Sequence, residues 1–176
     1  MTQNPDNSIL RITRLLVYLI MGFVALAGIV LVAMSVALPF FWTEAVAEIV
    51  KNKPEAQTAN LMPWLMVIFA LLVMTIGLVW TMMRKLLAII GSVENADPFV
   101  AANAIRLRAI GWLMVGVQII GIPLATTAGH VADMFGDNDV GHDFPINGIL
   151  AILLVFILAG IFERGAEMRE ELEGTV

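Results

Sequence analysis

Four long runs of apolar residues, each free of Asp, Glu, Lys and Arg, constrain this chain more than any other feature. A helix needs about 20 apolar residues to cross the hydrocarbon core of a bilayer. The runs are residues 15–38, 61–83, 109–129 and 144–162. Because 60% of the residues are hydrophobic and only 14% are charged, the composition departs from that of soluble domains. We expect an all-α integral membrane four-helix bundle in which residues 1–176 form a single membrane domain.

Basic residues fall unevenly on the two sides of these runs. Lysine and arginine beside membrane spans mark the cytoplasmic side, and eight of the 10 in the chain lie on one side. These are Arg11, Arg14, Arg84, Lys85, Arg106, Arg108, Arg164 and Arg169, whereas Lys51 and Lys53 lie on the other side. We therefore expect both termini, and the segment between the second and third runs, to be cytoplasmic. On the acidic outer side, residues 44–50 are predicted to form a short surface helix.

Polar residues paired with prolines mark the predicted starts of three helices. Asn and Asp side chains cap helix N-termini, and proline is favoured in the first turn. The pairs are Asn60 with Pro63, Asp97 with Pro98, and Asp143 with Pro145. The second helix has no breaker at Arg84, so it is predicted to continue to about Gly91 or Val93. The third is predicted to start at Pro98.

Residues 84–108 are therefore predicted to form a cytoplasmic helical hairpin, in which an apolar stripe of the first leg meets the second leg. The stripe is Leu86, Leu87, Ile90 and Val93, and its predicted partners are Val100, Ala104 and Leu107. Arg106 and Arg108 are two positions apart, so they point to different faces of the second leg. Anchoring at the membrane, recognition of a partner, and ion pairs with Glu163 or Glu167 are alternative roles for these arginines.

The last helix is predicted to continue beyond the membrane as a cytoplasmic tail, residues 163–176. Residues 163–172 contain good helix formers and no proline. A solvated charged tail is the alternative to a packed one, because exposed ion pairs stabilise little.

Small residues four positions apart mark a predicted packing ridge on the third span. Lipid tails provide no hydrophobic drive for helices to associate, so helices in a bilayer approach one another through small residues. Gly121, Ala125 and Gly129 share one helix face. We expect this ridge to contact a neighbouring helix, and Pro123 to bend the span.

Two stretches on the predicted cytoplasmic side resemble a known family. Asn95-Ala96-Asp97-Pro98-Phe99, followed by Asn103, Arg106-Leu107-Arg108 and Ile110-Gly111-Trp112, is similar to the pattern of the DUF2975 family of small four-span bacterial membrane proteins. The C-terminal stretch from Ile161 to Glu171, closing on Thr175-Val176, resembles the end of that family. Gly174 departs from the more continuous acidic ending of the pattern.

The resemblance implies a protein of the bacterial inner membrane whose function is uncharacterised. Members are often encoded beside a small helix-turn-helix regulator, which implies a cytoplasmic partner and membrane control of transcription, without direct binding of nucleic acid by this chain. The implied partner-binding residues are Asp97, Pro98, Phe99, Asn103, Arg106, Arg108, Glu163, Arg164, Glu167 and Arg169. Each also has a structural alternative: Asp97 caps, Pro98 starts a helix, Phe99 packs and the arginines anchor the chain to lipid.

A weak cation site is the one piece of metal chemistry that the sequence offers. The two histidines and four aspartates of the second outer loop could hold a divalent cation or, less readily, the histidines could hold a haem. These residues are His130, Asp133, Asp137, Asp139, His142 and Asp143. Their spacing lacks the glycine and glutamate of an EF-hand loop. We expect no resident cofactor.

Catalysis and ion conduction find little support. Cysteine is absent, no serine sits in a nucleophile-elbow context, and no phosphate-binding glycine loop is present. The four apolar runs contain no ionisable group of the kind that marks a transport path. We expect a non-enzymatic protein that binds lipids and a cytoplasmic partner, with homo-oligomers also possible. The alternatives are a sensor or transport accessory with a cation-binding outer loop, and a structural subunit of a membrane complex.

Overall fold

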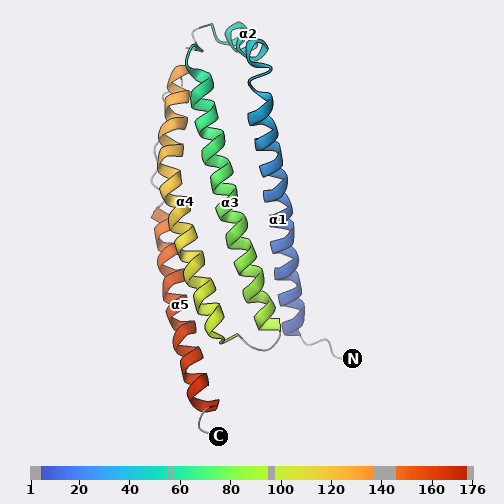
Figure 1. The fold of residues 1–176 in the computed structure, drawn as a ribbon, viewed down its shortest axis with the longest axis vertical. Coiled ribbons are helices and arrows are strands. Elements are labelled where there is room, and N and C mark those ends of the chain that lie inside the picture. Colours follow the sequence, from blue (N-terminus) through green and yellow to red (C-terminus); the bar gives the residue numbers. More distant parts are fainter. Residues whose placement is uncertain (1–4, 55, 57, 95–97, 137–145, 174–176) are drawn as a thin grey trace. The chain divides into compact units, whose positions relative to one another are not determined.

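The computed structural model shows an all-α chain and describes residues 5–54, 56, 58–94, 98–136 and 146–173 (Figure 1). Its helices are α1 (Pro5–Ala37), α2 (Trp42–Asn52), α3 (Leu61–Glu94), α4 (Ala101–Met134) and α5 (Ile146–Glu173). Four of these, α1, α3, α4 and α5, are long and apolar enough to cross a membrane. The all-α class and the multi-pass membrane character are therefore confirmed.

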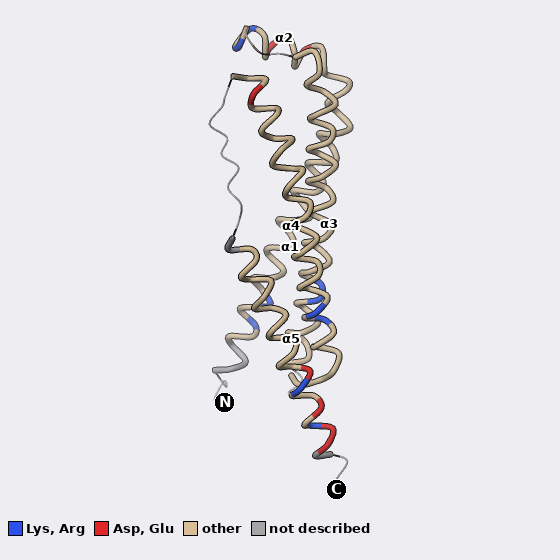
Figure 2. The backbone as a smooth tube through the Cα atoms, turned by 90° about the vertical axis from the view of Figure 1, so that its left-hand side faces the viewer, with Lys and Arg blue, Asp and Glu red and all other residues tan. Residues whose placement is uncertain are grey.

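Charged residues lie toward the ends of the spanning helices, and the stretches between them are uncharged (Figure 2). In α5 the acidic and basic residues gather at the C-terminal end, beyond the apolar run 144–162. Because α5 is one continuous helix to Glu173, the prediction that the last helix extends past its apolar run is confirmed. The short helix predicted over residues 44–50 is also confirmed, since α2 spans Trp42–Asn52.

The predicted boundaries around the link between α3 and α4 are right on one side and wrong on the other. Helix α3 passes Arg84 and ends at Glu94, which confirms its continuation. Helix α4 begins at Ala101, so the predicted start at Pro98 is wrong. The reason is that Asn103 donates its backbone N–H to the carbonyl of Val100 at 2.9 Å and its side-chain amide to the carbonyl of Pro98 at 2.9 Å.

Two predicted helix caps, those of Asp97 and Asp143, lie outside the described residues, and so does Pro145. At the start of α3, the backbone N–H of Leu61 donates to the carbonyl of Thr58 at 3.2 Å. Pro63 lies in the first turn of this helix, where its missing N–H leaves no intrahelical hydrogen bond unmade. The expected place of this proline is therefore confirmed.

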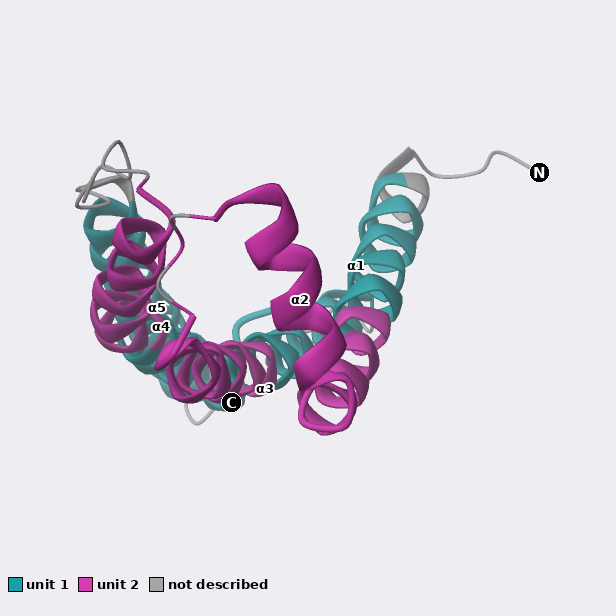
Figure 3. Ribbon diagram, turned by 90° about the horizontal axis from the view of Figure 1, so that it is seen from above, with its two compact units in different colours: residues 1–24, 78–116, 145–176 teal, residues 25–77, 117–144 magenta. Residues whose placement is uncertain are grey.

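The chain divides into two compact units (Figure 3). The first unit contains residues 1–24, 78–116 and 145–176, and the second contains residues 25–77 and 117–144. Helices α1, α3 and α4 each contribute a part to both units, whereas α5 belongs to the first and α2 to the second. The charged segments that the sequence singled out lie mainly in the first unit.

The core of the first unit is built on two different faces of α3. Ile89 packs with Leu107 and Ile110 of α4 and Ala159 of α5. Ile90, the next residue, packs instead with Val17 and Met21 of α1, together with Leu86 and Leu87. Successive residues of an α-helix point about 100° apart, which places these two contacts on different faces. Leu86, Leu87 and Ile90 of the predicted stripe therefore pack with α1. Leu107 does pack against α3, as predicted, but through Ile89, which is not in the stripe.

In the second unit the predicted small-residue ridge is buried at one end only, since Gly129 is buried in the described chain. Ala125 is exposed, and a Cβ added at Gly121 would have no described atom within 4 Å. Close helix approach occurs elsewhere, at Gly28, where an added Cβ would lie 3.3 Å from the Cγ2 of Ile76 in α3. Helix α4 stays continuous through Pro123, whose carbonyl accepts a 2.6 Å hydrogen bond from the hydroxyl of Thr127.

Candidate functional site

Asn103 is the centre of the polar contacts between α3 and α4. Its relative exposure is 0%, and it is the only fully buried polar residue among the largest buried side chains of the described chain. The side-chain amide donates to the hydroxyl of Ser92 at 2.5 Å and to the carbonyl of Pro98 at 2.9 Å. Its carbonyl oxygen accepts from the guanidinium of Arg106 at 2.7 Å. One side chain therefore joins α3, the link and α4.

The partners of Asn103 have further hydrogen bonds of their own. The Ser92 hydroxyl donates to the carbonyl of Ile89 at 2.7 Å, and the Arg106 guanidinium donates to the carbonyl of Ala88 at 3.2 Å. Both carbonyls lie in the last two turns of α3. Arg106 thus binds backbone near the end of α3, and among the described residues it does not pair with Glu163 or Glu167. Asn103 is fully buried and therefore cannot contact a partner.

Phe99 joins the link to α5. Its ring lies 5.4 Å from that of Phe162, measured between centroids, and the two planes are inclined by 38°. The same ring covers Gly165, where an added Cβ would lie only 2.7 Å from its Cδ1. Gly165 therefore has a reason to lack a side chain, because only a bare backbone leaves room for Phe99 at this point. Part of the ring remains exposed.

Arg108 and Glu163 form the ion pair that was one of the alternatives for this arginine. The guanidinium of Arg108 donates to the Glu163 carboxylate at 2.7 Å, and the two side chains are 51% and 46% exposed. This contact joins α4 to α5 near the stacked Phe99 and Phe162, and half-exposed pairs of this kind contribute modestly to stability. Arg108 and Glu163 are thus brought together as proposed, on the face opposite to that used by Arg106.

The other predicted residues of α5 lie on its surface. Arg164, Glu167 and Arg169 are exposed. Two large apolar side chains are exposed in the same part of the first unit, Ile105 at 66% and Met168 at 61%. Both lie outside the uncharged runs 109–129 and 144–162. The predicted binding residues in the described chain therefore separate into two groups. One group joins the helices and the link and includes the buried Asn103, and the other is exposed on α5.

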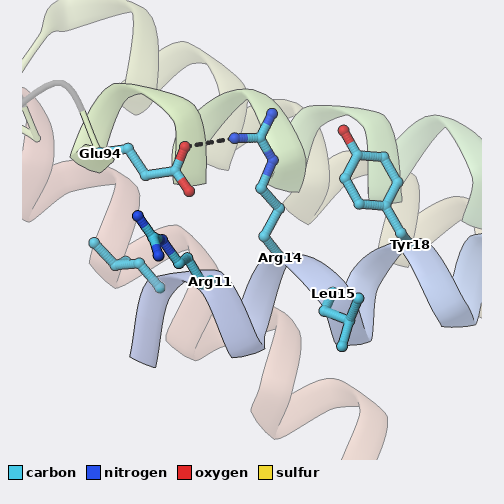
Figure 4. Close-up of a pocket in the computed structure, with 6 residues that line it drawn as sticks. Arg11, Arg14, Leu15, Tyr18 and Glu94 are labelled. Atoms are coloured by element: carbon cyan, nitrogen blue, oxygen red, sulfur yellow. Dashed lines mark hydrogen bonds and ion pairs between the residues drawn. The ribbon is translucent and has the colours of Figure 1, made fainter. Parts of the chain in front are cut away.

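A pocket of about 430 Å³ lies between the start of α1 and the end of α3 (Figure 4). The residues that line it are Leu10, Arg11, Arg14, Leu15, Tyr18 and Glu94. Arg14 donates to the Glu94 carboxylate at 2.6 Å, and its guanidinium carbon lies 5.9 Å from the centre of the Tyr18 ring. The ion pair joins α1 to α3, and it leaves the guanidinium of Arg11 beside the same opening.

The candidate cation ligands are placed only in part. Asp137, Asp139, His142 and Asp143 lie outside the described residues, so the proposed loop site stays a prediction. His130 is in α4, and its ring meets the ring of Trp64 of α3 edge-on, with centroids 5.2 Å apart. Asp133 lies one turn later in the same helix.

Sequence reasoning missed the contacts made by Ser92, Arg14 and Tyr18. Arg14 is the last charged residue before the first apolar run, and Glu94 is the last charged residue of α3. Opposite charges that flank two spans on the same predicted side are natural partners, and this is the signal that could have paired them. Ser92 gave a weaker one, since a single hydroxyl at a helix end has many local alternatives.

Comparison with known proteins gives one match. The model of the family described as "Protein of unknown function (DUF2975)" matches residues 87–176, just over half of the chain. The matched region begins in the last turns of α3 and includes the link, α4 and α5. It therefore contains Asn103, Phe99 and the Arg108–Glu163 pair. No curated protein and no solved structure matches the chain.

Proposed function

Because the chain belongs to the DUF2975 family, whose function is unknown, we propose that it is a non-enzymatic membrane protein that binds a cytoplasmic protein partner. The binding surface consists of the exposed residues at the end of α3, the start of α4 and the end of α5. The family resemblance points to a small helix-turn-helix transcription regulator as this partner. In that arrangement the chain holds the regulator at the inner membrane and does not itself contact DNA.

Helix length supports a hairpin that projects from the bilayer. Helices α3 and α4 each have 34 residues, or about 51 Å at 1.5 Å per residue, whereas the hydrocarbon core is about 30 Å thick. The surplus falls at the charged ends, which are the C-terminal part of α3 and the N-terminal part of α4. The excess of Lys and Arg there favours the cytoplasmic side. Residues 84–108 then form a cytoplasmic hairpin beside the tail, residues 163–176.

The observation that carries the proposal is the exposure of apolar side chains outside the apolar runs. Ile105 and Met168 are more than half exposed, and in this placement lipid tails do not cover them. Apolar surface rimmed by charges is typical of protein interaction sites, and Arg164 and Glu167 provide such a rim on α5. The buried contacts of Asn103 hold the hairpin in one conformation, which lowers the entropic cost of binding.

Site-specific photo-crosslinking tests the proposal in intact cells. A benzophenone amino acid is placed at Ile105 or at Met168, and the matched control is Phe23, which is 77% exposed within the first apolar run. We expect the first two positions to yield a discrete adduct with one cytoplasmic protein, and Phe23 to yield none. If all three positions give only lipid or self-adducts, the proposal is wrong.

Reporter fusions test the membrane placement separately. A reporter that is active only in the cytoplasm should be active when fused after Glu94 or after Glu173, and inactive when fused after Asn52. The reason is the charge bias described above. Activity after Asn52, or its loss after Glu94, would place the hairpin outside the cell and remove the proposed surface.

A further inference from the structure

The pocket between α1 and α3 carries a positive charge that the described residues do not neutralise. Glu94 pairs with Arg14 at 2.6 Å, which accounts for one of the two guanidinium groups that line the opening. The side chain of Arg11 points into the same space (Figure 4), and no partner for it occurs among the described residues. The pocket therefore has a net charge of one positive unit, which matches the single negative charge of a phosphodiester.

The donors in the pocket suit phosphate oxygens. Arginine forms bidentate hydrogen bonds with phosphate, and these charge-assisted bonds are stronger than those between neutral groups. The Tyr18 side chain lies on the same side of α1 as Arg14 and lines the same opening (Figure 4). Because Glu94 and Tyr18 hold Arg14 in place, little side-chain freedom remains to be lost when a ligand binds.

The apolar part of the lining points to a lipid instead of a free anion. Leu10 and Leu15 line the pocket beside the arginines, and Leu15 is the first residue of the apolar run 15–38. From Leu15 onward α1 exposes large apolar side chains, including Leu19 and Phe23. An inorganic phosphate makes no use of this surface, whereas an acyl chain attached to a bound headgroup would lie along it.

We infer that this pocket is a binding site for an anionic glycerophospholipid. The headgroup phosphodiester lies between Arg11 and Arg14, and an acyl chain follows the exposed apolar face of α1. The site lies at the proposed cytoplasmic boundary of the first span, where the anionic lipids of the inner leaflet attract basic side chains. The residues that line it do not include Ile105, Arg164, Glu167 or Met168, so the inference can be tested separately from the proposed partner surface.

Native mass spectrometry of the full chain in mild detergent tests this inference. The probes are phosphatidylglycerol, phosphatidylethanolamine and inorganic phosphate, each added alone at equal concentration. We expect phosphatidylglycerol to be retained more than either of the others. The substitution Arg11→Gln should reduce this retention about fivefold, which is the effect of one basic residue near an anionic lipid surface.

Two further variants separate binding from general charge and from misfolding. Arg11→Lys keeps the positive charge and should retain most of the lipid. Arg84→Gln removes the same charge from an exposed site on α3 that does not line the pocket, and should leave retention unchanged.

Three results would overturn the inference. One is equal retention of the two lipids by the wild-type protein. Another is displacement of phosphatidylglycerol by inorganic phosphate, which would make the site one for a free anion. The third is an equal loss of lipid in Arg84→Gln and Arg11→Gln. This result would show that lipid retention depends on the net charge of the protein and not on the pocket.

Discussion

Replacing Asn103 with alanine is expected to destabilise the protein more than the loss of any other single polar side chain among the described residues. The change removes three hydrogen bonds, to Ser92, Pro98 and Arg106. A hydrogen bond contributes about 1 kcal/mol net in water and about 0.6 kcal/mol between helices in a bilayer. The three together therefore amount to about 2–3 kcal/mol.

The free-energy cost within this range depends on whether the former hydrogen-bond partners of Asn103 keep other hydrogen bonds. Ser92 and Arg106 keep their bonds to the carbonyls of Ile89 and Ala88, so neither is left without a partner. The carbonyl of Pro98 loses the donor that fixes the link to α4. We expect the loss of Asn103 to loosen the link and the start of α4 first, and to leave the apolar contact of Ile89 with Leu107 largely in place.

Equilibrium unfolding in mixed micelles with increasing dodecyl sulfate measures this free energy, with helix content followed by circular dichroism. Asn52→Ala is the matched control. Asn52 also donates two hydrogen bonds, to the backbone and the carboxylate of Glu48 at 3.0 and 3.1 Å, but it is exposed. Its loss should cost less than about 0.5 kcal/mol. Equal costs for the two variants would refute the argument that burial makes the bonds of Asn103 count.

The remaining predictions use the same measurement. Gly165→Ala should destabilise by about 1 kcal/mol or more, because its Cβ would lie 2.7 Å from Phe99. Gly160→Ala, which meets no described atom within 4 Å, should be neutral or stabilise by up to about 1 kcal/mol through helix propensity; a cost equal to that of Gly165→Ala would contradict both. Arg108→Gln should cost about 0.5 kcal/mol, less in high salt, and an effect independent of salt would contradict the surface ion pair with Glu163.

The number and position of the spanning helices could be predicted from the sequence because they depend on a property of each segment alone. A run of about 20 apolar residues is too costly to leave in water and long enough to cross the bilayer. The continuation of α3 to Glu94 and of α5 to Glu173 followed equally from local sequence, since no breaker interrupts either helix. The predicted start of α4 at Pro98 was wrong because the side chain of Asn103 competes for the carbonyl of Pro98.

Which face of each helix meets which neighbour was not predictable in the same way. Both faces of α3 are apolar, and Ile89 and Ile90 are equally suited to a contact with α4 or with α1. Within the apolar runs there is a second reason, because lipid accepts apolar side chains as readily as another helix does, and an apolar stripe there does not mark the buried side. The predicted ridge lies in such a run, and Gly129 is buried there whereas Ala125 is exposed. Gly165 packs closely because one particular ring, Phe99, lies on it.

Three polar contacts determine which helix faces meet in the first unit, a choice that apolar packing alone does not make. Each joins one pair of consecutive spanning helices within the first unit, and together they connect α1 to α3, α3 to α4 and α4 to α5. They are Arg14 with Glu94, Ser92 with Asn103, and Arg108 with Glu163. Directional contacts of this kind fix the facing residues of two helices, which dispersion between apolar side chains does only weakly. Because no residue is shared among the three, the loss of one leaves the others intact, and only the contact made by the buried Asn103 is expected to carry a large cost.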